Sequence, residues 1–271
     1  MAEQSIRTAS AAAYELGECP RVDPRTGELL WVDVHVGRLH VGSYDGSAVR
    51  TRATYELGGR VSAVAPAVPD EGWLLATSRG LEHLGPHGRR LIGEVRGLLN
   101  DGVRDGRGRF WVGTISPPEA PYSGVLYRLD PDGGVHEMLR GIGASNGIGW
   151  SPDGRWMYLV DSHAKRVDVI EFDIESGALG RRQVFHRYEQ GTPDGLAVAA
   201  RGDVWVAVWD GWRVDRFSPD GRLIRSYRVP TARPTACCLL DPTTVLVTSA
   251  YWGLDRTEDP DAGRIFVLTF R

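Results

Sequence analysis

The sequence predicts an all-β fold and, within that class, a six-bladed β-propeller of four-stranded antiparallel blades. Short runs of β-branched and aromatic residues alternate with Gly, Pro, Asp and Asn, while helical periodicity is hard to find. Two motifs recur six times each along the chain. Equivalent copies begin about 38 to 48 residues apart, at Gly17, Ser62, Asn100, Asn146, Asp194 and Thr235, which is the spacing expected of propeller blades.

The bulk composition is that of a soluble globular protein with ample material for a core. The 271 residues are 42% hydrophobic and 25% charged. Thirty-four glycines and sixteen prolines suit a fold made mostly of hairpins. All-β folds of this size often form one unit, so we expect a single propeller domain over residues 1–271.

Charge and cysteine usage exclude several classes of partner. The formal net charge is −3 with both signs scattered, so we expect no nucleic-acid partner. No run of about 18 apolar residues occurs, so we expect no membrane span. The N-terminus, MAEQSIRTAS, lacks the features of a secretory signal. Three cysteines (Cys19, Cys237, Cys238) are too few for a disulfide framework, which favours a cytoplasmic location. The sequence leaves the oligomeric state open.

The first repeated motif is a short apolar strand, a turn, and a second apolar strand that ends in a small or polar residue. Its copies are LGECPRVDPRTGELLWVD (16–33), RVSAVAPAVPDEGWLLAT (60–77), NDGVRDGRGRFWVGT (100–114), SNGIGWSPDGRWMYLVDS (145–162), PDGLAVAARGDVWVAVW (193–209) and PTACCLLDPTTVLVTSA (234–250). The second motif follows each copy, as in GVLYRLDPDG and WRVDRFSPDG. One blade cannot bury both of its faces alone, so the six copies are expected to stack around one axis.

The ring needs a closing strand, because the last copy ends at Phe270, one strand short of a full blade. We expect the N-terminal segment, roughly Ile6 to Ala13, to supply this outer strand. A β-sandwich or an open meander is the alternative, and the six-fold regularity argues against both.

Residues that open the first motif are expected to meet at the mouth of the central channel, because the innermost strand of each blade lines that channel. These positions hold Glu18, Ser62, Asn100, Asn146, Asp194 and Thr235. A single Asn or Asp at such a place is most often a turn residue that bonds its own backbone. Their shared repeat position is not required of independent turns, so the set is stronger evidence than any one member.

Glu18, Asn100, Asn146 and Asp194 bring two carboxylates and two amides together, a hard oxygen site that suits a divalent cation. Without a cation the two carboxylates would repel each other, and one would take up a proton. Oxygen ligands favour calcium, with zinc, manganese and magnesium as alternatives. A glycine after these positions is expected to let the backbone turn sharply into the channel.

At these residues the sequence resembles the senescence-marker-protein/gluconolactonase/regucalcin family, six-bladed propellers with one catalytic divalent cation. The resemblance runs over nearly the whole chain and is carried by LGECP (16–20), NDGVRDGRGRFWVGT (100–114), SNGIGWSPDGRWMYLVDS (145–162), PDGLAVAARGDVWVA (193–207) and PTACC (234–238). It implies that Glu18, Asn146 and Asp194 bind the metal. It also implies that Asn100 lies beside the metal and contacts it or the substrate.

Three positions depart from the family pattern or extend it. Family lactonases often carry an arginine two residues before the NDG asparagine, where it holds a substrate hydroxyl or carboxylate. Leu98 stands there in this chain, which argues against sugar-acid lactones and for a less polar pocket. Glu119, in the loop ISPPEAPYSG, matches an acidic residue that family members place after the third blade's GT, and is a candidate substrate contact. Cys19 replaces a small residue and is expected beside the metal as a bystander, since sulfur is an unusual ligand for calcium.

The expected activity is metal-assisted hydrolysis of a cyclic ester, a small-molecule substrate, with Asp194 as metal ligand and general base. Asn100 would donate an amide hydrogen bond to the substrate. His163 and the aromatic residues Trp209, Trp212, Tyr251 and Trp252 are candidates for the rim, with packing between blades as the alternative for the aromatics and an exposed loop position for His163.

Two further functions stay open at this point. The same cation could serve another ester or a step in small-molecule biosynthesis, because Leu98 leaves the substrate undefined. The chain could also be a calcium-binding or protein-interaction propeller without catalysis. The acidic and amide residues on the axis weigh against that last function.

Overall fold

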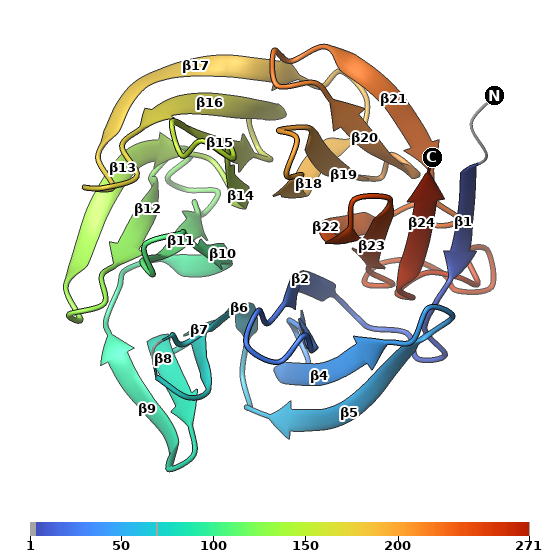
Figure 1. Ribbon diagram of the computed structural model, residues 1–271, viewed down its shortest axis with the longest axis horizontal. Coiled ribbons are helices and arrows are strands. Elements are labelled where there is room, and N and C mark those ends of the chain that lie inside the picture. The colour runs from blue at the N-terminus through green and yellow to red at the C-terminus, as the bar shows by residue number, and fades with distance from the viewer. Residues whose placement is uncertain (1–3, 69, 271) are drawn as a thin grey trace.

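The computed structural model describes residues 4–68 and 70–270, and it arranges six antiparallel sheets of four strands around a central axis (Figure 1). The described residues contain 24 strands and no helix. Both findings confirm the predicted all-β, six-bladed propeller. Among the described residues, accordingly, no helix is long and apolar enough to cross a membrane.

Each blade runs from an innermost to an outermost strand in chain order, except the last. Blade 1 consists of β2 (Gly17–Val22), β3 (Leu29–Asp33), β4 (Arg38–Tyr44) and β5 (Val49–Glu56), and blade 2 of β6 (Val61–Pro66), β7 (Trp73–Thr77), β8 (Gly80–Gly85) and β9 (Gly88–Gly93). Blade 3 consists of β10 (Leu98–Arg104), β11 (Phe110–Ile115), β12 (Gly124–Leu129) and β13 (Val135–Ile142), and blade 4 of β14 (Ser145–Trp150), β15 (Trp156–Asp161), β16 (Arg166–Phe172) and β17 (Leu179–Arg187). Blade 5 consists of β18 (Thr192–Val198), β19 (Val204–Trp209), β20 (Arg213–Phe217) and β21 (Leu223–Arg228). Blade 6 consists of β22 (Pro234–Asp241), β23 (Thr244–Ser249), β24 (Phe266–Phe270) and β1 (Gln4–Thr8).

The N-terminal strand closes the ring, as predicted, because β1 pairs antiparallel with β24 as the outermost strand of blade 6. Its bounds differ from the expected segment, since the strand ends at Thr8 and residues 9–13 lie outside it. The reason is that Ala9 links two blades. Its N–H donates to the Ile265 carbonyl in blade 6, and its own carbonyl accepts from Val49 in blade 1, both at 2.7 Å.

Apolar strands pack between neighbouring blades and form the core. All residues of β3 are buried, and so are the first five residues of β19 (VWVAVW). Both faces of such strands lie against other sheets, which explains why they read as continuous apolar runs and not as alternating ones. Trp111, Tyr158 and Trp205 are each at most 2% exposed, and they stand at equivalent positions in the second strands of blades 3, 4 and 5.

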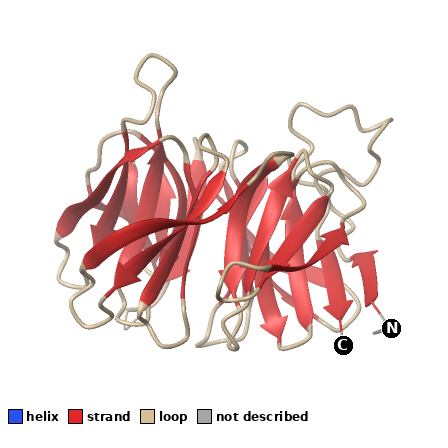
Figure 2. Cartoon of the chain, turned by 90° about the horizontal axis from the view of Figure 1, so that it is seen from above, coloured by secondary structure: helices blue, strands red, loops and turns tan. Residues whose placement is uncertain are grey.

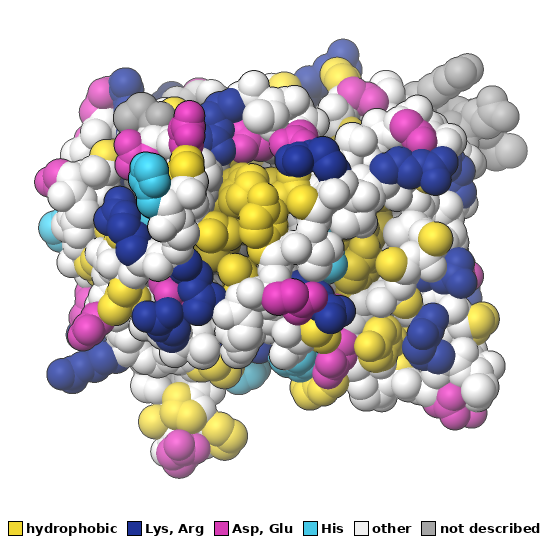
Figure 3. Space-filling view, turned by 90° about the horizontal axis from the view of Figure 1, so that it is seen from below, with side chains coloured by type: hydrophobic (Ala, Val, Ile, Leu, Met, Phe, Trp, Pro, Cys, Tyr) yellow, Lys and Arg dark blue, Asp and Glu magenta, His cyan; other side chains and the backbone are white. Residues whose placement is uncertain are grey.

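Two long loops project from the same end of the ring, as Figure 2 shows. They connect β11 to β12 (residues 116–123) and β23 to β24 (residues 250–265). Both leave from the end where the innermost strands begin, and we call this end the mouth face. On the side of the ring, hydrophobic side chains gather in a hollow (Figure 3), where blades 1 and 2 leave a cavity of about 420 Å³ beside Tyr55, Trp73 and Leu84.

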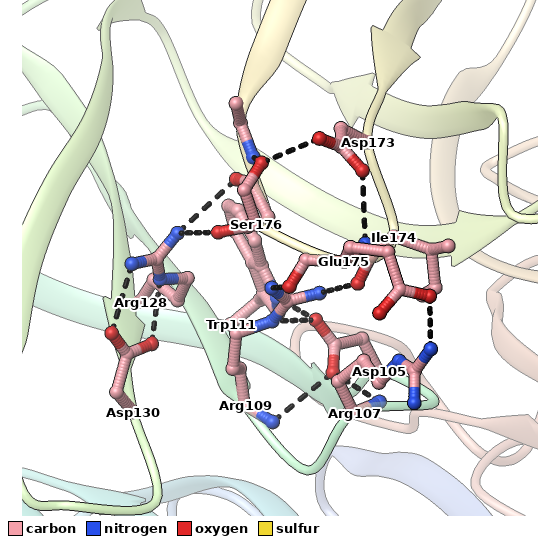
Figure 4. Close-up of polar contacts among 12 residues, drawn as sticks. Asp105, Arg107, Arg109, Trp111, Arg128, Asp130, Asp173, Ile174, Glu175 and Ser176 are labelled. Atoms are coloured by element: carbon pink, nitrogen blue, oxygen red, sulfur yellow. Dashed lines mark hydrogen bonds and ion pairs between the residues drawn. The ribbon is translucent and has the colours of Figure 1, made fainter.

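A network of charged side chains fixes blade 4 against blade 3 (Figure 4). Arg109 donates to the Ile174 carbonyl at 2.7 Å and to the Glu175 carbonyl at 3.2 Å, both in the turn between β16 and β17. Asp105 orients that arginine by accepting from its Nε at 2.6 Å, and it also accepts from the Trp111 indole at 2.9 Å. The position of blade 4 against blade 3 is thus set by polar bonds as well as by apolar packing.

Candidate functional site

The pairing register places the six axial residues at one equivalent position. In every blade, the residue just before the axial residue pairs with the last or next-to-last residue of the second strand. These pairs are Gly17 with Asp33, Val61 with Thr77, Leu99 with Thr114, Ser145 with Asp161, Pro193 with Val208, and Pro234 with Ser249. Glu18, Asn100, Asn146 and Asp194 therefore share the position that the repeat pattern predicts.

Every innermost strand carries one extra residue in its ladder at or directly after that position. In β14, for example, three steps from Ser145 to Ile148 face two steps from Asp161 to Leu159. The same shift occurs in the other five innermost strands. A β-bulge leaves a residue unpaired and re-aims its side chain, which is why bulges gather next to functional sites.

A ring of hydrogen bonds between blades fixes the backbone in front of the axial residues. Four carbonyls that each precede an axial residue accept from the neighbouring blade. The donors and carbonyls are Arg60 Nε to Leu99 (3.3 Å), Asn100 Nδ2 to Ser145 (3.0 Å), Ser162 Oγ to Pro193 (2.7 Å) and Thr235 Oγ1 to Gly17. Blades 2, 3, 4 and 6 thereby each position the axial residue of the next blade.

Two buried aspartates hold the chain that leads into Glu18 and Asn146. Asp33 accepts the backbone N–H groups of residues 15 and 16, both at 3.1 Å. Asp161, the equivalent residue of blade 4, accepts those of residues 143, 144 and 164 at 3.1 to 3.2 Å. These two carboxylates therefore hold the backbone segments that precede Glu18 and Asn146.

The glycines after Asn146 and Asp194 serve a different purpose from the one predicted. Neither Gly147 nor Gly195 has a positive φ, so neither makes a sharp left-handed turn. A Cβ on Gly147 would instead meet the backbone of the next blade, 2.8 Å from the Asp194 carbonyl oxygen. A Cβ on Gly195 would lie 2.7 Å from the Ala236 Cα. The innermost strands approach so closely that only glycine fits between them.

The carboxylates on the axis are held in a form that resists ionisation. Burial raises the pKa of Glu18 to about 8, with repulsion from Asp101 adding to the shift and Arg60 opposing it. Burial also raises the pKa of Asp194 well above its usual range, and Glu18 and Asp101 raise it further. The neighbouring Asn146 amide opposes that shift. Two such carboxylates beside each other favour a positive charge between them.

Oxygen atoms without partners mark the centre of this set. Among the described residues, Oδ1 of Asn146 and Oδ1 of Asp194 are buried and accept no hydrogen bond. The Asn146 amide is oriented by its donation to Ser162 Oγ at 3.2 Å. Buried polar atoms are seldom left unpaired, so these two oxygens fit the ligands of a hard cation. Within the described residues, no three or more His, Cys, Asp and Glu side chains gather as a metal site.

A buried ion pair, which sequence reasoning missed, adjoins this set. Asp101 Oδ1 accepts from the Gly102 N–H at 2.7 Å and lies 3.4 Å from Arg21 Nη2. Burial raises the pKa of Asp101, and the positive charge of Arg21 opposes this. Asp101 was visible in the NDG motif, but its pairing with an arginine of another blade has no signature in the sequence.

The remaining predicted residues lie on the mouth face or inside the wall. Leu98 is the first residue of β10 and is 49% exposed. Glu119 is exposed in the β11–β12 loop, and among the described residues its side chain forms no hydrogen bond with an axial residue. Cys19 is fully buried, its sulfur accepts the Val64 N–H at 3.3 Å, and burial raises the pKa of the thiol to about 12, which fits the predicted bystander.

The aromatic residues proposed for the rim reach the mouth face in part. Trp212 and Trp252 are 38% and 50% exposed, while Trp209 and Tyr251 are half-buried. Trp209 packs between Trp252, at 6.2 Å between ring centroids, and the guanidinium of Arg233, at 4.6 Å. Two further residues of this face, His163 and Tyr122, are exposed on neighbouring loops. The mouth face is thus bordered by aromatic side chains.

Comparison with known proteins finds relatives that align with most of the chain. A family model described as the SMP-30/gluconolactonase/LRE-like region matches residues 16–251. Regucalcin of Danio rerio is 32% identical over 271 aligned residues, which cover 94% of this chain and 90% of that protein. A 6-deoxy-6-sulfogluconolactonase of Pseudomonas putida is 34% identical and covers 87% of this chain and 83% of its own length.

Solved structures of the same kind superimpose over nearly the whole chain. A luciferin-regenerating enzyme gives a TM-score of 0.88 at 26% identity, covering 98% of this chain and 95% of its own. A regucalcin from Agrobacterium tumefaciens, described as a calcium-binding protein, gives 0.89 at 29% identity, with 98% and 94% covered. The sequence resemblance is confirmed, and the chain belongs to the SMP-30/gluconolactonase/LRE-like family.

Proposed function

We propose that this protein is a divalent-metal-dependent lactonase whose cation is held by Glu18, Asn146 and Asp194, with calcium favoured over zinc, manganese and magnesium. The observation that carries the proposal is the pair of buried oxygens without partners, Oδ1 of Asn146 and Oδ1 of Asp194, beside the half-buried carboxylate of Glu18. Carboxylate and amide oxygens are the ligands that calcium prefers.

A divalent ion bound there supplies Lewis-acid polarisation of the lactone carbonyl and lowers the pKa of water. Asp194 acts as the general base: it takes a proton from the attacking water as the water oxygen bonds to the carbonyl carbon. The ring C–O bond then breaks, and the proton passes from Asp194 to the alkoxide that leaves.

The other residues of the site bind and orient the substrate. Asn100 is fixed at both ends of its amide, since Nδ2 donates to the Ser145 carbonyl and Oδ1 accepts from Arg60 at 2.8 Å. It lies in register with the proposed metal ligands and faces the substrate's oxygen atoms. Leu98 and the aromatic side chains of the mouth face exclude water on the other sides, and Glu119 contacts the substrate from its loop.

The relatives support lactone hydrolysis as the class of reaction. The Pseudomonas putida relative is named for a lactone substrate, and regucalcins belong to the same family. A calcium-binding protein without catalysis is the second candidate, favoured by the description of the Agrobacterium tumefaciens structure. The two candidates differ in one measurable property, turnover of a lactone.

The test is hydrolysis of a panel of sugar and aliphatic lactones by the metal-loaded wild type, Glu18→Gln and Asp194→Asn. We expect turnover by the wild type and a loss of about 100-fold or more in kcat in both variants. Glu258→Gln serves as the matched control, because it removes one exposed carboxylate from the same mouth face. Full activity in Glu18→Gln and Asp194→Asn would show that the proposed site is wrong. Metal binding without turnover of any lactone would favour the second candidate.

A further inference from the structure

The arginine that is missing at Leu98 stands at the same repeat position one blade earlier. Leu98 precedes the axial residue Asn100 by two positions, and Arg60 precedes the axial residue Ser62 by two. The ladders confirm this equivalence, because Leu99 pairs with Thr114 as Val61 pairs with Thr77.

The guanidinium of Arg60 reaches across to blade 3 and lies against the site. Its Nη2 donates to Asn100 Oδ1 at 2.8 Å, and its Nε donates to the Leu99 carbonyl at 3.3 Å. Within the part of the chain that the structure describes, Nη1 of Arg60 donates no hydrogen bond. A positive charge therefore stands beside Asn100 although residue 98 is a leucine.

This charge has no carboxylate partner among the described residues, whereas two other arginines near the site have one. Arg21 pairs with Asp101, and Arg233 pairs with Asp210 at 2.7 Å, whereas no ion pair to Arg60 occurs among the described residues. Arg60 is half-buried, and burial lowers its pKa, with Glu18 opposing the shift from a distance. A divalent cation would balance the charges of Glu18 and Asp194, which leaves Arg60 as the uncompensated charge of the site. A partly desolvated guanidinium without a carboxylate favours binding of an anionic group.

We propose that Arg60 is the specificity-determining residue of this site and that it binds a carboxylate carried by the lactone substrate. That the substrate is a lactone rests on the proposed function. That it carries a carboxylate rests on the contacts of Arg60. It reverses the expectation of a less polar pocket, which considered residue 98 alone.

A purely structural role for Arg60 makes a different prediction. If Arg60 only fixed the Asn100 amide and joined blades 2 and 3, its loss would lower kcat/KM equally for acidic and neutral substrates. Recognition of a carboxylate instead makes the loss depend on the substrate's charge. The discriminating quantity is the ratio of kcat/KM between a carboxylate-bearing lactone and its neutral counterpart.

Glucaric acid 1,4-lactone and glucono-1,4-lactone form such a pair, because they differ in a carboxylate against a hydroxymethyl group. In metal-loaded protein, we expect Arg60→Ala to lower kcat/KM about 30-fold or more for the acidic lactone and less than about threefold for the neutral one. Arg60→Lys keeps the charge and should retain part of the preference. Arg96→Ala, which removes an exposed arginine from the same mouth face, should change neither value. Equal losses on both lactones, or no loss on either, overturn the inference and leave the lactonase proposal intact.

A binding measurement separates the two proposals if no lactone is hydrolysed. Calorimetric titration of each lactone should then show that the wild type binds the acidic one about tenfold more tightly, and that Arg60→Ala abolishes this preference. Binding of neither lactone by the wild type, or a preference that survives the substitution, overturns the role of Arg60. Should Arg60→Ala fail to fold, Arg60→Gln removes the charge, keeps an amide donor and carries the same test.

Discussion

Replacing Asp161 by alanine should destabilise the protein substantially, because this buried carboxylate holds the chain that leads into Asn146. It is fully buried and accepts three backbone N–H groups at 3.1 to 3.2 Å. A hydrogen bond to a charged group contributes roughly 1.5 to 3 kcal/mol, and these three lie at the long end of the usual range. The variant no longer has to bury a charged carboxylate, which offsets part of this loss. We therefore expect the free energy of unfolding to fall by about 3 to 4 kcal/mol.

Urea denaturation followed by circular dichroism measures this loss, and two variants give the comparison. Asp161→Asn keeps one acceptor oxygen and should lose about 1 to 2 kcal/mol. Asp132→Ala removes an exposed aspartate that accepts a single backbone N–H at 2.9 Å, and it should lose less than about 1 kcal/mol. A loss below about 1 kcal/mol in Asp161→Ala, or one equal to that of Asp132→Ala, would refute the reasoning.

Three more predictions concern residues that join or fill the blades. Asp105→Ala leaves the Arg109 guanidinium and the Trp111 indole without their shared acceptor, so unfolding in urea should show a loss of about 3 to 5 kcal/mol, and a loss under 1 kcal/mol would contradict the role of this network. Burial lowers the pKa of His40 to about 4, with Arg38 adding to the shift, so the unfolded chain takes up the proton first. The contribution of neutral His40 to the free energy of unfolding is complete above about pH 6.5 and falls by roughly 3 kcal/mol as the pH drops towards 4. The difference in unfolding free energy between the wild type and His40→Gln should show this pH dependence. A difference that does not change with pH would exclude it. Gly147→Ala places a methyl group against the next blade and should lower the free energy of unfolding by about 3 kcal/mol or more. Gly133 has a positive φ and open space around it, so Gly133→Ala should lower it by about 1 kcal/mol. Similar shifts of the melting temperature in the two variants would contradict the close approach of the blades.

The sequence predicted the ring because each blade is a local repeat whose strands, turns and axial position recur in order. The equivalence of Glu18, Asn100, Asn146 and Asp194 follows from that repetition, and the ladder registers agree with it. The closing strand was also predicted, because an incomplete last blade needs a partner. Its bounds were less accurate, since Ala9 bonds to two blades and nothing in its local sequence indicates this.

Contacts between blades were the part that the sequence could not show. The role of Gly147 depends on how closely the next strand approaches, which no spacing within its own blade reveals. Arg60 and Asp101 were missed for the same reason, because their partners Asn100 and Arg21 belong to other blades. The repeat does contain one usable signal, because Arg60 stands two positions before the axial residue Ser62, as Leu98 does before Asn100.

The metal site itself is tested most directly by calorimetric titration of calcium into metal-stripped protein. We expect one calcium ion to bind per wild-type chain, and Glu18→Gln and Asp194→Asn to weaken binding about 100-fold or more, while Glu258→Gln binds as the wild type does. Repeating the titration with zinc, manganese and magnesium ranks the alternatives. A wild type that binds none of these ions, or axial variants that bind calcium with unchanged affinity, would contradict the site.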